Sequence, residues 1–430
     1  MERKIFCDIL NSEMELATGC TEPAAVALCA AYAREYLEGD VGEVHVSASV
    51  NIIKNAMSAG IPGLKDTGIN YAAALGALGG DTTRQLQVID NVSPHVCQQA
   101  EALVKAGHVK MSRKETPEKL YVEVTLKSLQ GHSARAVIAA SHTNLVCVEK
   151  DGKTVLSRPA DRRGNGVTLE EMDRVLSIQN IYDFANTADP AQDDLHMIQQ
   201  AIIINRRIAQ EGAAVKFNLH VGQNIAAAKA EGLMSNDLVT TAIERTACGI
   251  DARMGGAGVP VVTNSGSGNQ GITATVPVIT AAEFLQADEL KTLRAVTLSN
   301  LMAIYIHCHF GLLSALCGAT IAGTGTACAI TYLLGGNATQ IGLAVNNMMG
   351  AVTGMLCDGA KSDCALKVSA CIHTAFLSAF MAMRDVGVQP NEGIVEMSPE
   401  QTIKNFVRLG NDGSPTMDRI ILDIMLNKEL

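Results

Sequence analysis

Three cysteines in the C-terminal part of the chain have a spacing that could bind a metal centre. Cys357 and Cys364 are seven residues apart, and Gly359 between them allows the backbone to turn so that both thiolates face one point. Cys317 lies forty residues before Cys357. A zinc ribbon needs two close cysteine pairs, which this spacing lacks. Three sulfur ligands from two segments fit a cubane iron–sulfur cluster with one iron left open. The competing interpretation is buried cysteine in a core of small residues.

A further cysteine, Cys20, precedes a predicted helix start. The segment Thr18–Pro23 interrupts two helical stretches, with Thr21 as a good N-cap and Pro23 near the first helical position. Unpaired N–H groups and the helix dipole favour an anion at such a place, which predicts a lowered pKa for the Cys20 thiol. A thiolate there could act as a base, a nucleophile or a ligand, and the alternative is a structural cysteine at a helix entry.

Two sets of residues could hold a small anionic ligand. The glycine-rich loop Ser265–Gly271 could cradle a carboxylate or phosphate with its amides, although it lacks the lysine of a P-loop. Lys54-Asn55 and Ser141–Asn144 end strand-like runs, a common place for ligand contacts. Because residues 295–357 carry no fixed charge, a buried carboxylate needs a cation from elsewhere, which favours Lys54, with Lys361 as the alternative. The candidate binding residues are Lys54, Asn55, Ser265, Ser267, Asn269 and Gln270.

The elements that must position these residues follow two kinds of pattern. Met1–Glu38 predicts two helices, and from Leu169 the pattern is helical almost to the end. Between them, apolar and polar residues alternate as in strands, with tight turns at Gly131-His132 and Asp151-Gly152. The predicted strands are Val44–Val50, Leu120–Leu129, Ala134–Ala140 and Leu145–Lys150, and a helix is predicted over Val96–Ala106.

The predicted fold class is therefore α+β, with a mostly helical domain and a smaller domain that contains an antiparallel or mixed sheet. We expect residues 41–157 to form the sheet domain and residues 158–430 the helical domain, joined by the polar linker Arg158–Gly166. Residues 1–40 should pack on the helical domain, because Cys20 can act as a base at the cysteine set only from close range.

Composition excludes several classes of protein. The 430 residues are 47% hydrophobic but only 3% aromatic, which suits close packing of helices around a centre. The formal net charge of −10 and the lack of a basic stripe argue against a nucleic-acid partner. No Asp, Glu, Lys or Arg occurs between Arg294 and Asp358. Because that stretch holds many glycines, asparagines and histidines, we interpret it as the core of a bundle and not as a membrane hairpin.

The other cysteines are expected to be reduced. No export signal is apparent in Met1–Leu10, so the twelve cysteines predict a cytoplasmic protein without disulfides. Those outside the candidate set are expected to be small apolar core residues. They are Cys7, Cys29, Cys97, Cys147, Cys248, Cys308, Cys328 and Cys371.

Several of these motifs together resemble the L-cysteine desulfidase family, which is related to the α part of iron–sulfur L-serine dehydratases. The likeness runs along essentially the whole chain, and the Gly354–Asp358 segment also resembles the serine dehydratase cluster region. The resemblance implies a [4Fe–4S] cluster as cofactor and Cys20 as catalytic base. The motifs that carry it are Thr18–Pro23, Lys54–Ala56, Gly60–Gly63 and the implied cluster ligands Cys317, Cys357 and Cys364.

One departure from the related dehydratases concerns the chain end. Some of those enzymes place a C-terminal cysteine at the cluster as a resting ligand, whereas no cysteine follows Cys371 here. The resting fourth ligand therefore stays open between water, substrate and Cys20.

The resemblance implies a lyase that eliminates sulfide from L-cysteine to give pyruvate, ammonia and hydrogen sulfide, with the cluster as a non-redox Lewis acid. The same machinery could act on L-serine as a dehydratase, and the sequence does not separate the two substrates. A non-catalytic iron–sulfur or metal-binding sensor is the third hypothesis, and the lack of DNA-binding charge weighs against it. We expect a small amino-acid substrate and no nucleic-acid or membrane partner, and we allow for a homodimer.

Overall fold

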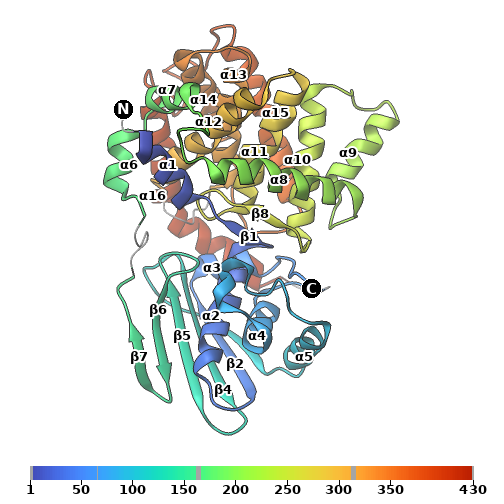
Figure 1. The fold of residues 1–430 in the computed structure, drawn as a ribbon, viewed down its shortest axis with the longest axis vertical. Helices are drawn as coiled ribbons and strands as arrows, with labels where there is room; N and C mark the ends of the chain where they lie inside the picture. The colour runs from blue at the N-terminus through green and yellow to red at the C-terminus, as the bar shows by residue number, and fades with distance from the viewer. Residues whose placement is uncertain (1–2, 65, 161–165, 311–315, 429–430) are drawn as a thin grey trace.

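The computed structural model describes residues 3–64, 66–160, 166–310 and 316–428. It consists of two packed parts, a bundle of helices and a six-stranded sheet with helices of its own (Figure 1). Each part has its own main hydrophobic core. The predicted α+β class is confirmed. Residues 161–165 of the predicted linker Arg158–Gly166 lie outside the described residues.

The sheet is mixed. In spatial order its strands are β3 (Val109–Arg113), β2 (Val41–Ala48), β4 (Tyr121–Ser128), β5 (Ser133–Ala139), β6 (Leu145–Lys150) and β7 (Lys153–Ser157). Strands β2 and β3 are parallel, and the other neighbouring pairs are antiparallel. Buried side chains alternate with less buried ones along β4, so its sequence predicts a strand. The pattern does not predict β7, because most of that strand is exposed and has no apolar face.

The helices of the sheet part lie on the sheet in layers. Helix α2 (Thr21–Tyr36) packs on β4, β5 and β6, while α4 (Ile69–Gly79) packs on β2 and β3. The short helix η1 (Thr82–Gln87) contacts α2, and α5 (Pro94–Lys105) packs on α4. The buried faces of α2, α4 and the strands form one continuous core.

The expectation that both N-terminal helices pack on the helical part is wrong for the second of them. Helix α1 (Arg3–Glu13) contacts α8 (His196–Ala214) and α12 (Glu289–His307) of the bundle, whereas α2 lies on the sheet. Most residues of α2 are buried, so this helix must pack against other elements on all its faces. The space between the sheet and α4 provides that packing.

The bundle is centred on α13 (Gly318–Leu333), which packs against α11, α12, α14 and α15. Most of α12 and all of α13 and α14 belong to the stretch without formal charge, and their side chains are largely buried. By length and composition alone, α15 could cross a membrane, and it packs against α10, α13 and α14. The other helices are α6 (Leu169–Val175), α7 (Ile178–Thr187), α8 (His196–Ala214), α9 (Val221–Ala230), α10 (Leu238–Met254), α11 (Gly268–Phe284), α12 (Glu289–His307), α14 (Ala338–Val352), α15 (Cys364–Ala382) and α16 (Pro399–Leu426).

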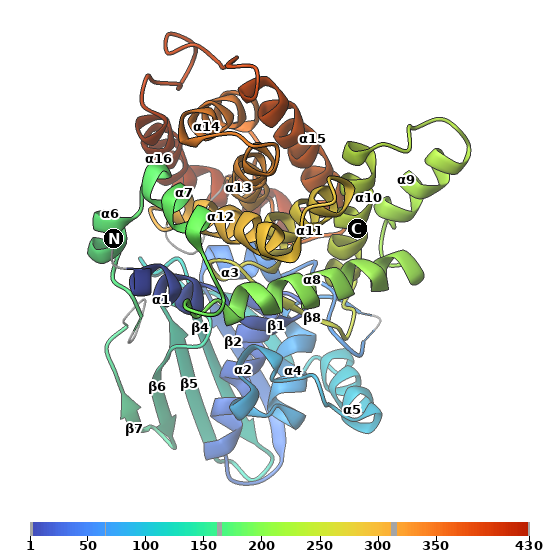
Figure 2. The ribbon, with the colours of Figure 1, turned by 45° about the horizontal axis from the view of Figure 1, so that its top comes forward.

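The two parts meet along α3 (Val50–Ala56), α16 and a ribbon formed by β1 (Leu16–Thr18) and β8 (Pro260–Val262) (Figure 2). In this ribbon Thr18 pairs with Pro260. The buried Asn205 side chain fixes β8, since it accepts from the Val262 N–H at 2.9 Å and donates to the Val262 carbonyl at 3.0 Å. The ribbon therefore joins the segment after β1 to the segments on either side of β8.

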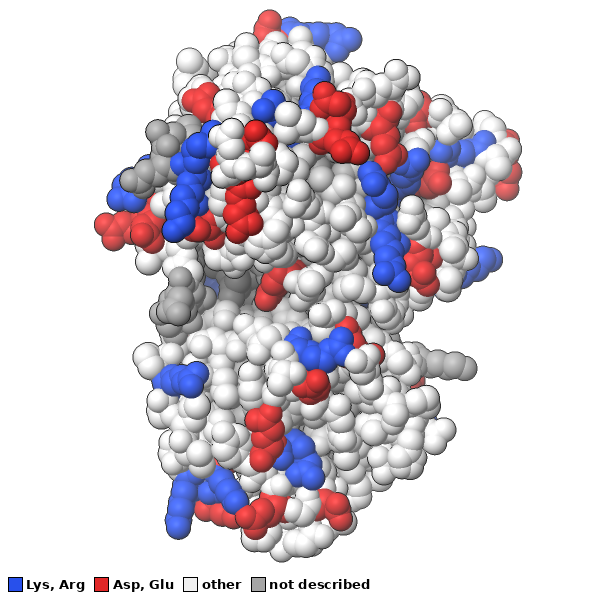
Figure 3. Space-filling view, viewed as in Figure 1, with Lys and Arg blue, Asp and Glu red and all other residues white. Residues whose placement is uncertain are grey.

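Charges of both signs are interspersed over the face drawn in Figure 3. Among the surface ion pairs, Arg245 and Arg206 both reach Glu283, at 2.6 and 3.0 Å. Exposed pairs of this kind contribute little to stability. One ion pair that is buried, Lys54 with Asp418, lies where α3 and α16 of the two parts meet.

Candidate functional site

The structure brings Cys317, Cys357 and Cys364 together. Cys317 is the N-cap of α13, Cys364 is the first residue of α15, and Cys357 lies in the loop between α14 and α15. The Cys317 N–H donates to the Met355 carbonyl at 2.9 Å, which ties the two segments side by side. Burial, and then the charges of Cys357 and Cys364, raise the pKa of the Cys317 thiol well above its ordinary value. All three are free thiols.

Two lysines hold the loop that carries Cys357. Lys367 Nζ donates to the Leu356 carbonyl at 2.9 Å and pairs with Asp358. Lys361 also pairs with Asp358, and it lies 3.2 Å from Asp363. Burial acts to raise the pKa of Asp358, but the hydrogen bonds from Lys361 and Lys367 lower it to about 2. Lys361, the alternative cation for a ligand carboxylate, is thus paired within its own loop.

Lys54 lies in helix α3, so the prediction that it ends a strand is wrong. Its side chain is fully buried, and Nζ donates to Asp418 Oδ1 at 2.7 Å and to the Cys357 carbonyl at 3.0 Å. Asn51 Nδ2 donates to the other oxygen of Asp418 at 2.8 Å. The loop rests on α3, because a Cβ at Gly359 (φ +104°) would come within 2.4 Å of the Lys54 carbonyl oxygen. Asp418 on α16 therefore already neutralises the lysine that we expected to bind a carboxylate.

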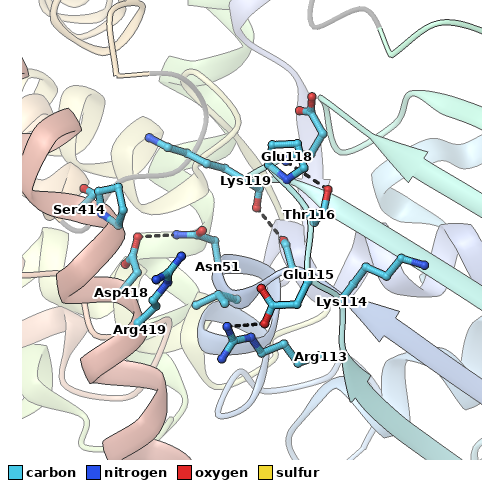
Figure 4. Close-up of a pocket in the computed structure, with 14 residues that line it drawn as sticks. Asn51, Arg113, Lys114, Glu115, Thr116, Glu118, Lys119, Ser414, Asp418 and Arg419 are labelled. Atoms are coloured by element: carbon cyan, nitrogen blue, oxygen red, sulfur yellow. Dashed lines mark hydrogen bonds and ion pairs between the residues drawn. The ribbon is translucent and has the colours of Figure 1, made fainter.

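A cleft of about 260 Å³ opens beside this ion pair, between the start of α3, residues 113–119 and α16 (Figure 4). Asn51 and Asp418 line it, joined by the hydrogen bond drawn there. No cysteine lines the cleft. Its relation to the cysteine set is indirect, through Lys54, which contacts both Asp418 and the Cys357 carbonyl.

Cys20 is the N-cap of α2, in place of the predicted Thr21, and its side chain makes no capping hydrogen bond. The residue is buried, and its charge acts to raise the pKa of Cys364. Burial raises the pKa of the Cys20 thiol to about 11, against a lowering effect from Arg253. The predicted lowering of this pKa is wrong, because desolvation outweighs the helix terminus.

The donor set fits an iron–sulfur cluster. Cys20 and Cys317 are the N-caps of α2 and α13, and Cys364 is the first residue of α15, so all three thiols lie at helix N-termini, where negative charge is favoured although burial raises their pKa values. Cys317, Cys357 and Cys364 are the residues that would hold the group, and thiolates are the usual ligands of such clusters. Cys371 lies seven residues along α15 from Cys364 and contacts Met355 Sδ at 3.5 Å, and its charge, like those of Cys357 and Cys364, acts to raise the pKa of Cys317.

The glycine-rich loop has mostly structural contacts. Ser265 has a positive φ of 48°, and its N–H donates to the Glu13 carbonyl at 2.7 Å. Ser267 is the N-cap of α11, where its hydroxyl accepts from the Gln270 N–H at 3.3 Å. The Gln270 side chain bonds to Asn264 at 2.7 Å and to His307 at 2.9 Å. The amides expected to cradle an anion are thus in part used to form the turn itself.

A buried polar cluster beside Cys20 was not predicted as a unit. Asn55 Nδ2 donates to Glu22 Oε1 at 2.9 Å, and Arg253 Nη1 donates to Asn269 Oδ1 at 2.9 Å. Burial acts to raise the pKa of Glu22, yet His142, Asn55 and Arg253 hold it below its ordinary value. Burial lowers the pKa of His142, against the opposing effect of Glu22. The pairing of β1 with β8 and the hydrogen bond from the Gly60 N–H to the Met254 carbonyl at 3.2 Å join segments that are distant in sequence, so no local pattern signals Arg253.

A second group of possible metal ligands lies at the end of α12. Cys308, His309 and Asp173 have ligand atoms within 4.8 Å of one another. Cys308 is buried, as expected, and its thiol donates to the Tyr305 carbonyl at 3.1 Å. His309 Nε2 is 3.3 Å from Asp173 Oδ1, and that carboxylate is exposed. This group resembles an ordinary surface ion pair beside a buried cysteine.

Together, fold and site define an α+β protein with a thiol-rich, buried polar site between its two cores. A family model described as the serine dehydratase alpha chain matches residues 83–423, and the chain belongs to this family. The predicted relation to the α part of serine dehydratases is thereby confirmed. Relatives of the same length are UPF0597 proteins. That of Oleidesulfovibrio alaskensis is 42% identical over 99% of this chain and 98% of its own. That of Porphyromonas gingivalis is 40% identical over 98% of both chains.

Proposed function

We propose that this chain is an iron–sulfur lyase that eliminates sulfide from L-cysteine to give pyruvate, ammonia and hydrogen sulfide. The observation that carries the proposal is that the segments of Cys317, Cys357 and Cys364 contact one another. The Cys317 N–H donates to the Met355 carbonyl at 2.9 Å, and the Cys364 thiol lies 3.8 Å from the Gly359 carbonyl in the loop that carries Cys357. L-serine dehydratase activity is the second candidate, and the family match supports it.

Cysteine side chains of this chain would bind the cluster, and nearby helix N-termini and Lys54 would position those cysteines. When bound, a [4Fe–4S] cluster with one iron free of protein ligands supplies a Lewis acid toward the β-sulfur of the substrate. Cys317 and Cys364 lie at the N-termini of α13 and α15, where the unpaired N–H groups act against the burial that raises the pKa of both thiols. Lys54 fixes the intervening loop through the Cys357 carbonyl, and Asp418 holds the Lys54 ammonium group in place.

The reaction breaks the Cα–H and Cβ–S bonds of L-cysteine and forms a Cα=Cβ bond. The products of that step are aminoacrylate and hydrogen sulfide. Aminoacrylate then rearranges to the imine, and water converts the imine to pyruvate and ammonia, so no electron donor is needed. Cys20 is the proposed base for the Cα proton. Because burial raises the pKa of its thiol to about 11, Cys20 must first give up its own proton, and Glu22 and His142 are the titratable neighbours in the site.

Anaerobic reconstitution with iron and sulfide tests the proposal. We expect an iron–sulfur absorbance spectrum, four iron atoms per chain, and pyruvate formation from L-cysteine. The ratio of kcat/KM for L-cysteine and L-serine decides between the two candidates, because the same machinery can act on either leaving group. Protein that stays colourless and iron-free would reject the cluster, whereas a stable cluster without turnover on either amino acid would support a sensor.

A further inference from the structure

The polar cluster beside Cys20 contains buried hydrogen-bonding groups that the protein itself leaves unused. Arg253 is 3% exposed, and Asn269 accepts from its Nη1, but its Nε has no acceptor. No ion pair of Arg253 is found among the residues that the structure describes. Asn55 Oδ1 and His142 Nε2 are likewise buried and without a partner.

An unpaired guanidinium in this position is strongly unfavourable. The group has lost its hydration and gains only one neutral amide in return. Glu22 acts on Arg253 electrostatically, yet its two oxygens already accept hydrogen bonds from Asn55 at 2.9 Å and from Thr21 at 3.0 Å. A ligand carboxylate would satisfy the remaining donors of the guanidinium, which are arranged to bind such a group in two-point fashion.

We propose that this cluster binds a free α-amino acid by its two charged ends. The Arg253 guanidinium takes the α-carboxylate, and Asn55 Oδ1 accepts from the α-ammonium group, whose positive charge the nearby Glu22 carboxylate balances. The unused donor and the unused acceptor match the two ends of a zwitterion. This inference rests on the proposed function for its substrate class, and it replaces Lys54 and Lys361 as the carboxylate site. It also places the α-carbon of the ligand near Cys20. The pKa of the Cys20 thiol is lowered by the charge of Arg253 and raised by that of Glu22.

The position of Arg253 depends on the start of α11. A Cβ added at Gly268 would come within 2.2 Å of Arg253 Nε, so the guanidinium lies directly against the glycine. Gly268→Ala should therefore displace the guanidinium without removing any functional group from the site.

Calorimetric titration with three small probes tests the proposal. L-Alanine carries both charged ends but no β leaving group, so it binds without being consumed, while propionate and ethylamine each lack one end. We expect the wild-type protein to bind L-alanine at least about 10-fold more tightly than either fragment, as the loss of a charged contact requires. Arg253→Met should weaken binding of L-alanine by about 100-fold and leave that of ethylamine unchanged. Arg245→Met, an exposed arginine on the same helix, is the matched control and should change neither.

Three results would overturn the inference: wild-type affinity of Arg253→Met for L-alanine, unchanged binding in Gly268→Ala, or equal affinity of the wild type for L-alanine and propionate. If Arg253→Met does not fold, the second and third measurements still decide. The titration can be done on the cluster-free protein, so it tests the amino-acid site independently of the proposed lyase function. Arg253-dependent binding of L-alanine by a protein that, once reconstituted, has no lyase activity would reject the proposed function alone. Lyase activity with Arg253-independent binding would reject only this inference.

Discussion

The buried pair of Lys54 and Asp418 allows a quantitative prediction. Nζ and Oδ1 are 2.7 Å apart, and the two side chains are 0% and 6% exposed. At that distance the Coulomb attraction is about 6 kcal/mol for an effective dielectric constant of about 20. The cost of desolvation offsets much of this, but removing one partner leaves the other charge buried and uncompensated. Asp418→Asn should therefore lower the free energy of unfolding by about 3–5 kcal/mol.

Urea denaturation of the cluster-free protein measures this loss. Asp412→Asn on the same helix is the control, because the pair of Arg408 and Asp412 is largely exposed and should contribute less than about 0.5 kcal/mol. The double variant Lys54→Met/Asp418→Leu should recover most of the lost stability, since no unpaired charge remains. A loss in Asp418→Asn no larger than that in Asp412→Asn would refute the reasoning. A double variant less stable than either single one would refute it as well.

Further predictions concern the cysteines and the sheet. Cys364→Ala should prevent iron incorporation, whereas Cys371→Ala should retain most of it; equal iron loss in both would show that the ligand set is misassigned. Cys20→Ser should keep the cluster spectrum but lose most lyase activity, because a hydroxyl is a far weaker base than a thiolate; loss of iron from this variant would make Cys20 a ligand. Burial acts to raise the pKa of Glu123, but hydrogen bonds from Arg135 and its neighbours lower it to about 2. Its stabilising effect is therefore present above about pH 4.5 and is lost as the pH falls toward 2. Acid denaturation curves should show a smaller loss in that range for Glu123→Gln than for the wild type, and parallel curves would contradict the assignment.

Local sequence pattern was sufficient for most of the sheet. The alternation in β4 and β5 and the turn at Asp151-Gly152 are set by residues close in sequence, and the structure has strands at those places. The prediction for the thiol of Cys20 failed because it considered only the helix start. The burial that raises the pKa of Cys20 comes from segments distant in the chain, which a local argument does not contain.

The contacts of the candidate site are set by residues far apart in sequence. Lys54 and its partner Asp418 are 364 residues apart, and Cys357 is 303 residues from Lys54. The sequence pattern shows a lysine in an apolar segment and suggests a free cation, whereas the fold supplies a counter-ion from the last helix. For Arg253 the opposite holds. No residue near it in sequence indicates a buried binding group, whereas the fold shows a buried guanidinium without a carboxylate partner.

The contacts of Lys54 with Asp418 and with the Cys357 carbonyl also have a consequence for the biogenesis of the protein. Asp418 follows Cys357 by sixty-one residues, so all three of the proposed cluster ligands are synthesised before α16 is complete. Until that helix docks, Lys54 has no counter-ion and the Cys357 carbonyl has no fixed donor. We therefore expect cluster insertion to follow completion of the chain. A nascent or truncated chain would present the same thiols in an unsupported loop, open to oxidation and to the wrong metal.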